Sequence, residues 1–162
     1  MREAIIIVLL AVRLFFGCPE WLSGDGCSPV VKALAYPFFH ASIWHLGVNA
    51  IAVWTVFRPR KGNALLLVTA SAISFAVYPL SARPMVGISN LIYAAIGLRT
   101  PSLRSPWWRT PSVIIFLIVT ALMLALPQFS AVTHIAAFAA GCACAAIRRC
   151  FLRVKRDAHR YL

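Results

Sequence analysis

Long apolar runs, separated by short polar or basic segments, follow one another along the whole chain. The runs cover approximately residues 3–17, 37–57, 63–80, 89–103, 112–126 and 131–147. An α-helix rises about 1.5 Å per residue, so runs of this length cross most of a hydrocarbon core about 30 Å thick. Backbone polar groups in lipid must be satisfied within the protein. The pattern therefore predicts an all-α membrane protein, a bundle of six transmembrane helices.

The basic residues are distributed unevenly between the segments that join these runs. Under a six-helix topology, 13 of the 16 Lys and Arg residues lie on one side. Lys32 and Arg83 lie on the other side, and Arg13 lies within the first helix. An excess of Lys and Arg is typical of cytoplasmic loops. We expect a multi-pass protein of a prokaryotic inner membrane with both termini cytoplasmic. Residues 1–150 form its membrane domain and residues 151–162 a basic tail.

The composition supports a membrane location and argues against a nucleic-acid partner. Hydrophobic residues make up 61% of the chain and charged residues 12%, whereas soluble domains carry about 25% charged residues. The basic residues that give the net charge of +12 cluster in short segments between or after the apolar runs, without a basic and aromatic face. We therefore expect the lipid bilayer as a partner, with the basic tail contacting anionic lipid.

A polar segment at residues 18–36 predicts a long outer loop. It contains Cys18 and Cys27. If this loop faces an oxidising compartment, the two thiols can pair as a disulfide. Two free thiols are the other interpretation.

A few polar side chains fall inside the apolar runs, where they are costly and usually functional. Counted from the basic end of each helix, Asn49 lies roughly 14 Å deep and His134 roughly 21 Å. Ser89 lies roughly 15–22 Å deep, depending on where its helix ends. Three helices thus bring polar groups to a similar depth. A serine, a histidine and an amide at one level are typical of an acyl-transfer site.

The turn Gly87-Ile88-Ser89-Asn90 leads directly into an apolar helix. Ser89 is therefore predicted at a helix N-terminus, where backbone N–H groups are free. A lone serine in a membrane helix usually hydrogen-bonds its own backbone, and a lone histidine is usually interfacial. The combination of the turn, Tyr93 and His134 favours a functional site.

Two histidines precede Asn49 in the second run. On a regular helix His40 and His45 project roughly 140° apart, and the zinc-protease pattern requires an i, i+4 pair with a glutamate. We therefore predict no metal site and no cofactor. His45 and Asn49 are four residues apart and share a face, so they can donate hydrogen bonds to a common point.

These residues together resemble the rhomboid family of intramembrane serine proteases. His40, His45 and Asn49 are similar to its HxxxxHxxxN pattern, and Gly87-Ile88-Ser89 to the start of its GxSG motif. Tyr93, Gly97, His134 and Gly141 also resemble the family pattern. The resemblance implies a six-helix rhomboid-like bundle that cleaves peptide bonds in or near transmembrane segments of other membrane proteins.

The resemblance also implies a role for each residue. Ser89 would be the nucleophile and His134 the general base, a dyad without a carboxylate. Tyr93 would orient the imidazole, and Gly87 would open the turn. The Ser89 backbone N–H, with His45 and Asn49, would stabilise the oxyanion, and His40 would tie down the outer loop.

Two positions depart from the family pattern. Asn90 replaces the glycine after the nucleophile, and Ala137 replaces a glycine three residues after the last-helix histidine. Asn90 favours an alternative, a rhomboid-like pseudoprotease that binds membrane proteins without cutting them. A third interpretation is a small transporter or channel. The second to sixth helices contain no acidic residue, which argues against proton or cation coupling.

Overall fold

The computed structural model describes residues 1–22, 27–58, 62–81, 85–100, 114, 118, 121 and 131–158. All regular secondary structure in these ranges is helical. The longer helices are α1 (Arg2–Phe16), α2 (Pro29–Ala35), α3 (Ile43–Val56), α4 (Asn63–Val77), α5 (Ser89–Arg99) and α7 (Ala131–Ala158). Three short 3₁₀ helices are η1 (Glu20–Leu22), η2 (Tyr36–Phe38) and η3 (Tyr78–Leu80).

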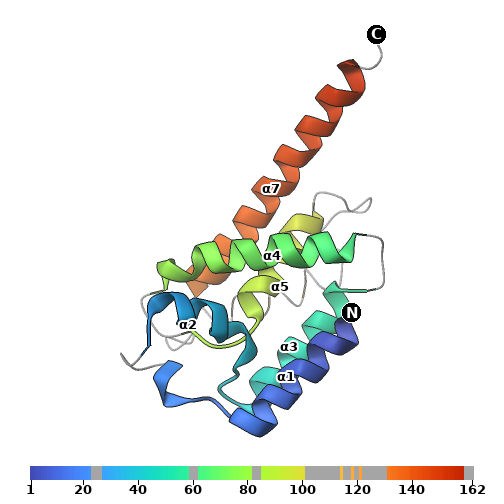
Figure 1. Cartoon of the computed structure of the whole chain (residues 1–162). Coiled ribbons are helices and arrows are strands. Elements are labelled where there is room, and N and C mark those ends of the chain that lie inside the picture. The colour runs from blue at the N-terminus through green and yellow to red at the C-terminus, as the bar shows by residue number, and fades with distance from the viewer. Residues whose placement is uncertain are drawn as a thin grey trace.

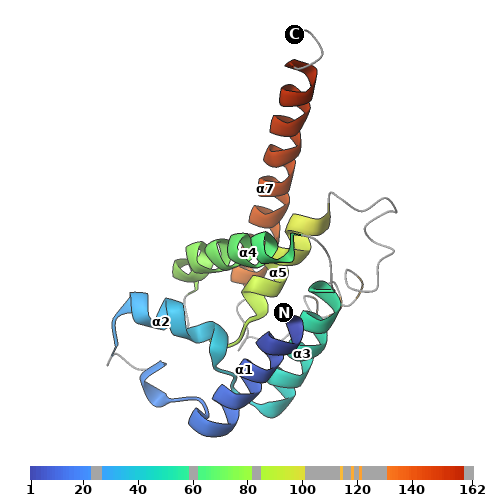
Figure 2. The ribbon, with the colours of Figure 1, turned by 45° about the vertical axis from the view of Figure 1, so that its right-hand side comes forward.

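Helix α5 lies at the centre of the bundle. Every residue from Ser89 to Gly97 is buried, so this helix has no face directed outward over that length. It packs most extensively against α7, and also against α4 and α3. Helices α1 and α3 lie side by side, and the C-terminal half of α7 extends away from the other helices (Figures 1 and 2).

The contact between α5 and α7 depends on two glycines. A Cβ atom added to Gly97 would overlap the Phe138 carbonyl oxygen, and one added to Gly141 would overlap the Ala94 carbonyl oxygen. Small residues at such crossings let two membrane helices approach until their backbones touch. This close approach brings the beginning of α5 next to the beginning of α7.

Two arginines join the ends of neighbouring helices. The Arg2 guanidinium lies 3.6 Å from the centre of the Trp54 ring and donates to the Trp54 carbonyl oxygen at 3.2 Å, which ties α1 to α3. Arg99, the last residue of α5, donates to the Val56 carbonyl oxygen and, at 2.6 Å, to Asn63 Oδ1. It therefore connects the end of α3 to the start of α4.

The interior of the bundle is an apolar core that also holds several polar side chains, and many large apolar side chains lie on the exterior. Asn49, Ser74 and Thr133 are among the buried polar residues, whereas Trp44 is 83% exposed and Phe15 82% exposed.

Within the described ranges, two helical stretches are long and apolar enough to cross a membrane, Asn63–Leu80 and Ala131–Val154, and the apolar helix Ile43–Val56 is shorter. The fifth predicted helix, residues 112–126, lies almost entirely outside the described residues.

Several predicted boundaries need correction. The second helix begins at Ile43 rather than at residue 37, because Phe39 is extended and the extended Ser42 caps α3, its Oγ accepting from the His45 N–H at 3.1 Å. The last helix continues to Ala158 rather than ending near residue 147. The predicted outer loop contains α2, which starts at Pro29 after the Ser28 cap.

Candidate active site

Ser89 is the first residue of α5, directly after a tight turn. Gly87 has a φ of 103°, a conformation that favours glycine. A Cβ atom at this position would lie 2.8 Å from His45 Cε1 and 3.1 Å from Asn49 Nδ2. The turn therefore needs glycine both for its backbone conformation and for its close packing against α3.

The hydroxyl of Ser89 and the imidazole of His134 meet between α5 and α7. Ser89 Oγ and His134 Nε2 are 2.7 Å apart, within hydrogen-bond distance, although the residues are 45 positions apart in the sequence. Ser89 is 9% exposed and His134 is 6% exposed. A buried hydroxyl bonded to an imidazole nitrogen can transfer its proton to that nitrogen when the oxygen attacks an electrophile.

Tyr93 lies one helical turn after Ser89 and packs on the imidazole. Its ring centroid is 4.7 Å from that of His134, with an angle of 62° between the ring planes. An edge-to-face contact of this kind restricts rotation of the imidazole. The four-residue spacing thus places the hydroxyl and the supporting ring on the same face of α5, the face that meets His134 of α7.

Two residues of α3 pack against the turn at Gly87. His45 and Asn49 both lie next to Gly87 Cα, as the tight space there shows. Asn49 is buried, and its Nδ2 has no hydrogen-bond partner among the described residues. A buried amide donor left without a partner is costly unless a ligand or a reacting group accepts its hydrogen bond.

His40 occupies a different position from the one that the spacing predicts. It precedes α3 instead of lying on it, so the predicted 140° separation from His45 is wrong, and the two ring centroids are 5.2 Å apart in an edge-to-face contact. His40 is fully buried. Burial is the main cause that lowers the pKa of its imidazole to about 4, and the charge of the neighbouring His45 lowers it further. The described part of the chain holds no group of three potential metal-binding side chains.

Asn90 and Thr133 enclose Met85 beside the serine. Asn90 is 1% exposed; its Nδ2 lies 3.6 Å from Met85 Sδ, and the Thr133 hydroxyl lies 3.3 Å from the same sulfur. Asn90 is helical, and no residue other than glycine has a positive φ in the described ranges. The position after the serine therefore does not require a conformation that only glycine adopts.

Tyr36 is a site residue that the sequence analysis missed. Its carbonyl oxygen accepts the Gly87 N–H at 2.9 Å, and its hydroxyl bonds both the hydroxyl and the carbonyl oxygen (3.2 Å) of Ser74. Its ring also stacks on Tyr78, 5.0 Å away. The sequence places Tyr36 at the end of the predicted outer loop, residues 18–36, and no local pattern indicates that it reaches a turn about fifty residues later.

The fold and the site together define a class of protein. It is a helical membrane protein with a serine at a helix N-terminus, bonded to a histidine of a second helix. The family model of the rhomboid domain matches residues 28–150, well over half of the chain. The chain therefore belongs to the rhomboid family, whose members are membrane proteins and generally serine intramembrane proteases. A comparison with curated proteins found no match.

Proposed function

We propose that this protein is an intramembrane serine protease that uses Ser89 and His134 as a catalytic dyad. The observation that supports this most directly is the 2.7 Å separation of Ser89 Oγ and His134 Nε2 in a buried position. The four acidic residues of the chain are Glu3, Glu20, Asp25 and Asp157, none of them in the stretch that contains the site. The dyad therefore works without a carboxylate.

Catalysis begins with attack of the Ser89 oxygen on a substrate carbonyl carbon, while His134 Nε2 takes the hydroxyl proton. Tyr93 holds the imidazole in the orientation that receives this proton. The carbonyl oxygen becomes an oxyanion, which accepts hydrogen bonds from the Ser89 N–H, from Asn49 Nδ2 and from His45. Each well-placed donor contributes about 3–4 kcal/mol to the stability of the transition state. His134 then protonates the leaving amine, and water hydrolyses the acyl-enzyme.

The substrate is a transmembrane segment of another membrane protein. Its backbone must leave the helical conformation locally, because helical carbonyl groups are bonded to their own N–H groups and are not accessible. Such a segment enters laterally between helices, and water enters from the outer side.

Six spans with both termini cytoplasmic in a prokaryotic inner membrane fit the distribution of basic residues. We place the membrane domain at residues 1–150 and the basic cytoplasmic tail at 151–162.

The test is labelling with a fluorophosphonate probe in proteoliposomes, followed by cleavage of a transmembrane test substrate. Wild type should be labelled and should cleave, whereas Ser89→Ala and His134→Ala should do neither. Ser71→Ala serves as the matched control, since Ser71 is an exposed serine of α4. Equal labelling of wild type and Ser89→Ala would refute the nucleophile assignment.

Asn90 supports a second candidate, a pseudoprotease that binds membrane proteins without cutting them. The amide fills the space beside Met85 where the family pattern has glycine. If the protein is a pseudoprotease for this reason, Asn90→Gly should gain cleavage from a baseline of none. If the protein is a protease, wild type already cleaves, and Asn90→Gly loses stability because it removes a buried side chain.

A further inference from the structure

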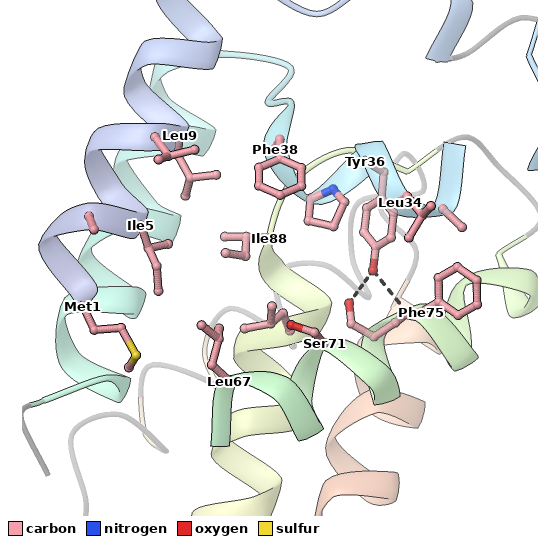
Figure 3. A pocket seen from close by; sticks show the side chains of 16 residues that line it. Met1, Ile5, Leu9, Leu34, Tyr36, Phe38, Leu67, Ser71, Phe75 and Ile88 are labelled. Atoms are coloured by element: carbon pink, nitrogen blue, oxygen red, sulfur yellow. Dashed lines mark hydrogen bonds between the residues drawn. The ribbon is translucent and has the colours of Figure 1, made fainter. Parts of the chain in front are cut away.

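An apolar cavity of about 470 Å³ lies next to the start of α5 (Figure 3). Its walls come from α1, α4, the start of α5 and the α2–η2 segment. Ile5 and Leu9 face Leu67 across it, and Ile88, the residue before Ser89, contributes to a third wall. No charged side chain lines the cavity. Two serines do, Ser71 and Ser74, and the carbonyl oxygen of Ser74 already accepts a hydrogen bond from the Tyr36 hydroxyl.

The cavity continues into the apolar exterior of the bundle. Among its lining residues, Val8, Leu34, Phe38 and Phe75 are each more than 40% exposed. These residues border the cavity on α1, on the α2–η2 segment and on α4. In a membrane protein such a border is surrounded by lipid hydrocarbon, so the cavity is continuous with the hydrocarbon of the bilayer.

The size and chemistry of the cavity restrict what can fill it. Water is disfavoured, because a buried water needs two to four polar partners. A helix with side chains is about 10–12 Å across, so a single turn would fill roughly 400–600 Å³, the whole cavity. At roughly 30 Å³ per methylene, close to the share of one water molecule in the liquid, the cavity corresponds to a chain of roughly 16 carbons.

We propose that this cavity binds one acyl chain of a membrane phospholipid. Apolar walls that no atoms pack against lose their dispersion contacts, and the surrounding bilayer supplies chains of the required length. The bound chain lies against Ile88 and Leu91, on either side of Ser89 in the sequence.

The test is photo-crosslinking of the full-length protein in vesicles of phosphatidylethanolamine and phosphatidylglycerol. The probe is a phosphatidylethanolamine with a diazirine in the middle of its palmitoyl chain. Crosslinks should concentrate at lining residues of α1, α4 and α5 when mapped by mass spectrometry. Ser71→Trp fills the cavity from α4 and should lower the crosslinking there about tenfold, since a close-packed indole leaves no room for a chain.

Matched controls separate filling of the cavity from general disturbance. Ala72→Trp places the same indole on the adjacent exposed position, which does not line the cavity, and should crosslink as wild type does. Ala4→Phe fills the cavity from α1, with Ile7→Phe as its control, in case Ser71→Trp does not fold.

Equal crosslinking of both filling variants and wild type, or crosslinks spread evenly over the exposed apolar residues, would overturn the proposal. The measurement requires no catalysis, so Ser89→Ala should crosslink as wild type does, whatever the outcome of the fluorophosphonate test.

Discussion

Single side chains from distant parts of the sequence hold the serine turn in place. Tyr36 provides the carbonyl group that accepts the Gly87 N–H, and its hydroxyl is bonded to Ser74 on α4. One residue therefore connects the segment before α3 to the turn before α5. Gly87 is held from the opposite side by its close packing against His45 and Asn49.

The Tyr36 hydroxyl is expected to position the turn and also to contribute to stability. Tyr36→Phe should lower the free energy of unfolding by about 0.6–1 kcal/mol, the usual value of one hydrogen bond inside a membrane protein. It should also slow fluorophosphonate labelling of Ser89. Tyr78→Phe is the matched control, because the Tyr78 hydroxyl forms no hydrogen bond with the described residues. Equal effects of the two substitutions on labelling would contradict a positioning role for Tyr36.

Asn49 should matter for the chemical step more than for folding. If its free Nδ2 group stabilises the oxyanion, Asn49→Ala should lower kcat for peptide cleavage about 100-fold, the typical effect of losing one such donor. The thermal unfolding midpoint should change little, because the amide nitrogen has no partner to lose among the described residues. Thr55→Val, also on α3, removes a hydroxyl that donates to the Ile51 carbonyl oxygen of its own helix and should leave cleavage unchanged. A fall in stability that accounts for the whole loss of activity would contradict the oxyanion assignment.

At the scale of elements, the site depends on how closely α5 and α7 approach. Ser89 and His134 both lie in the first turn of their helices, so the crossing of the two axes sets their separation. Gly97 and Gly141 allow backbone contact further along the same pair of helices. Ala137, which is fully buried, also keeps the interface narrow.

A methyl group added at this crossing should separate the helices. Gly141→Ala places a Cβ atom against the Ala94 carbonyl oxygen and should destabilise the protein by about 1–3 kcal/mol, as overpacking of a tight interior usually does. Fluorophosphonate labelling should fall with it, because the serine and the imidazole move apart. Ala143→Leu, at an exposed position of α7, is the control. If Gly141→Ala kept both wild-type stability and wild-type labelling, the close approach would not be required.

At the scale of the whole molecule, apolar side chains form both the core and much of the exterior, and polar groups are buried among them. Histidine, asparagine and serine side chains are buried along α3, α4, α5 and α7, and large apolar side chains cover the exterior. This arrangement suits a hydrocarbon solvent, in which exposed apolar surface has no cost and polar groups must find partners inside.

The six-span topology predicts opposite sides of the membrane for two exposed cysteines. Cys18 and Cys150 are both exposed, and the five cysteines are free. In single-cysteine variants, a membrane-impermeant maleimide should label Cys18 in right-side-out vesicles and Cys150 only in inverted ones. Labelling of both from the same side would contradict an even number of spans with both termini cytoplasmic.

The site residues could be found in the sequence because their chemistry is unusual in this setting. Ser89, His134, Asn49 and His45 are polar residues within apolar helical runs, and lipid makes such positions too costly to occur often by chance. Helical periodicity was enough to place His45 beside Asn49 and Tyr93 one turn after Ser89. The catalytic roles remain predictions, but the structure brings these side chains together.

Only the tertiary structure decided the rest, because the contacts involved have no local pattern in the sequence. His40 leaves the helix and packs on His45, and Tyr36 reaches the turn before Ser89; both depend on how the segment before α3 folds over α4 and α5. The acyl-chain cavity likewise arises where four segments fail to fill the space between them. Hydrophobicity and helical spacing along the chain determined which residues enter the membrane and which of them are polar, whereas side-chain packing between helices decided which of those polar groups meet.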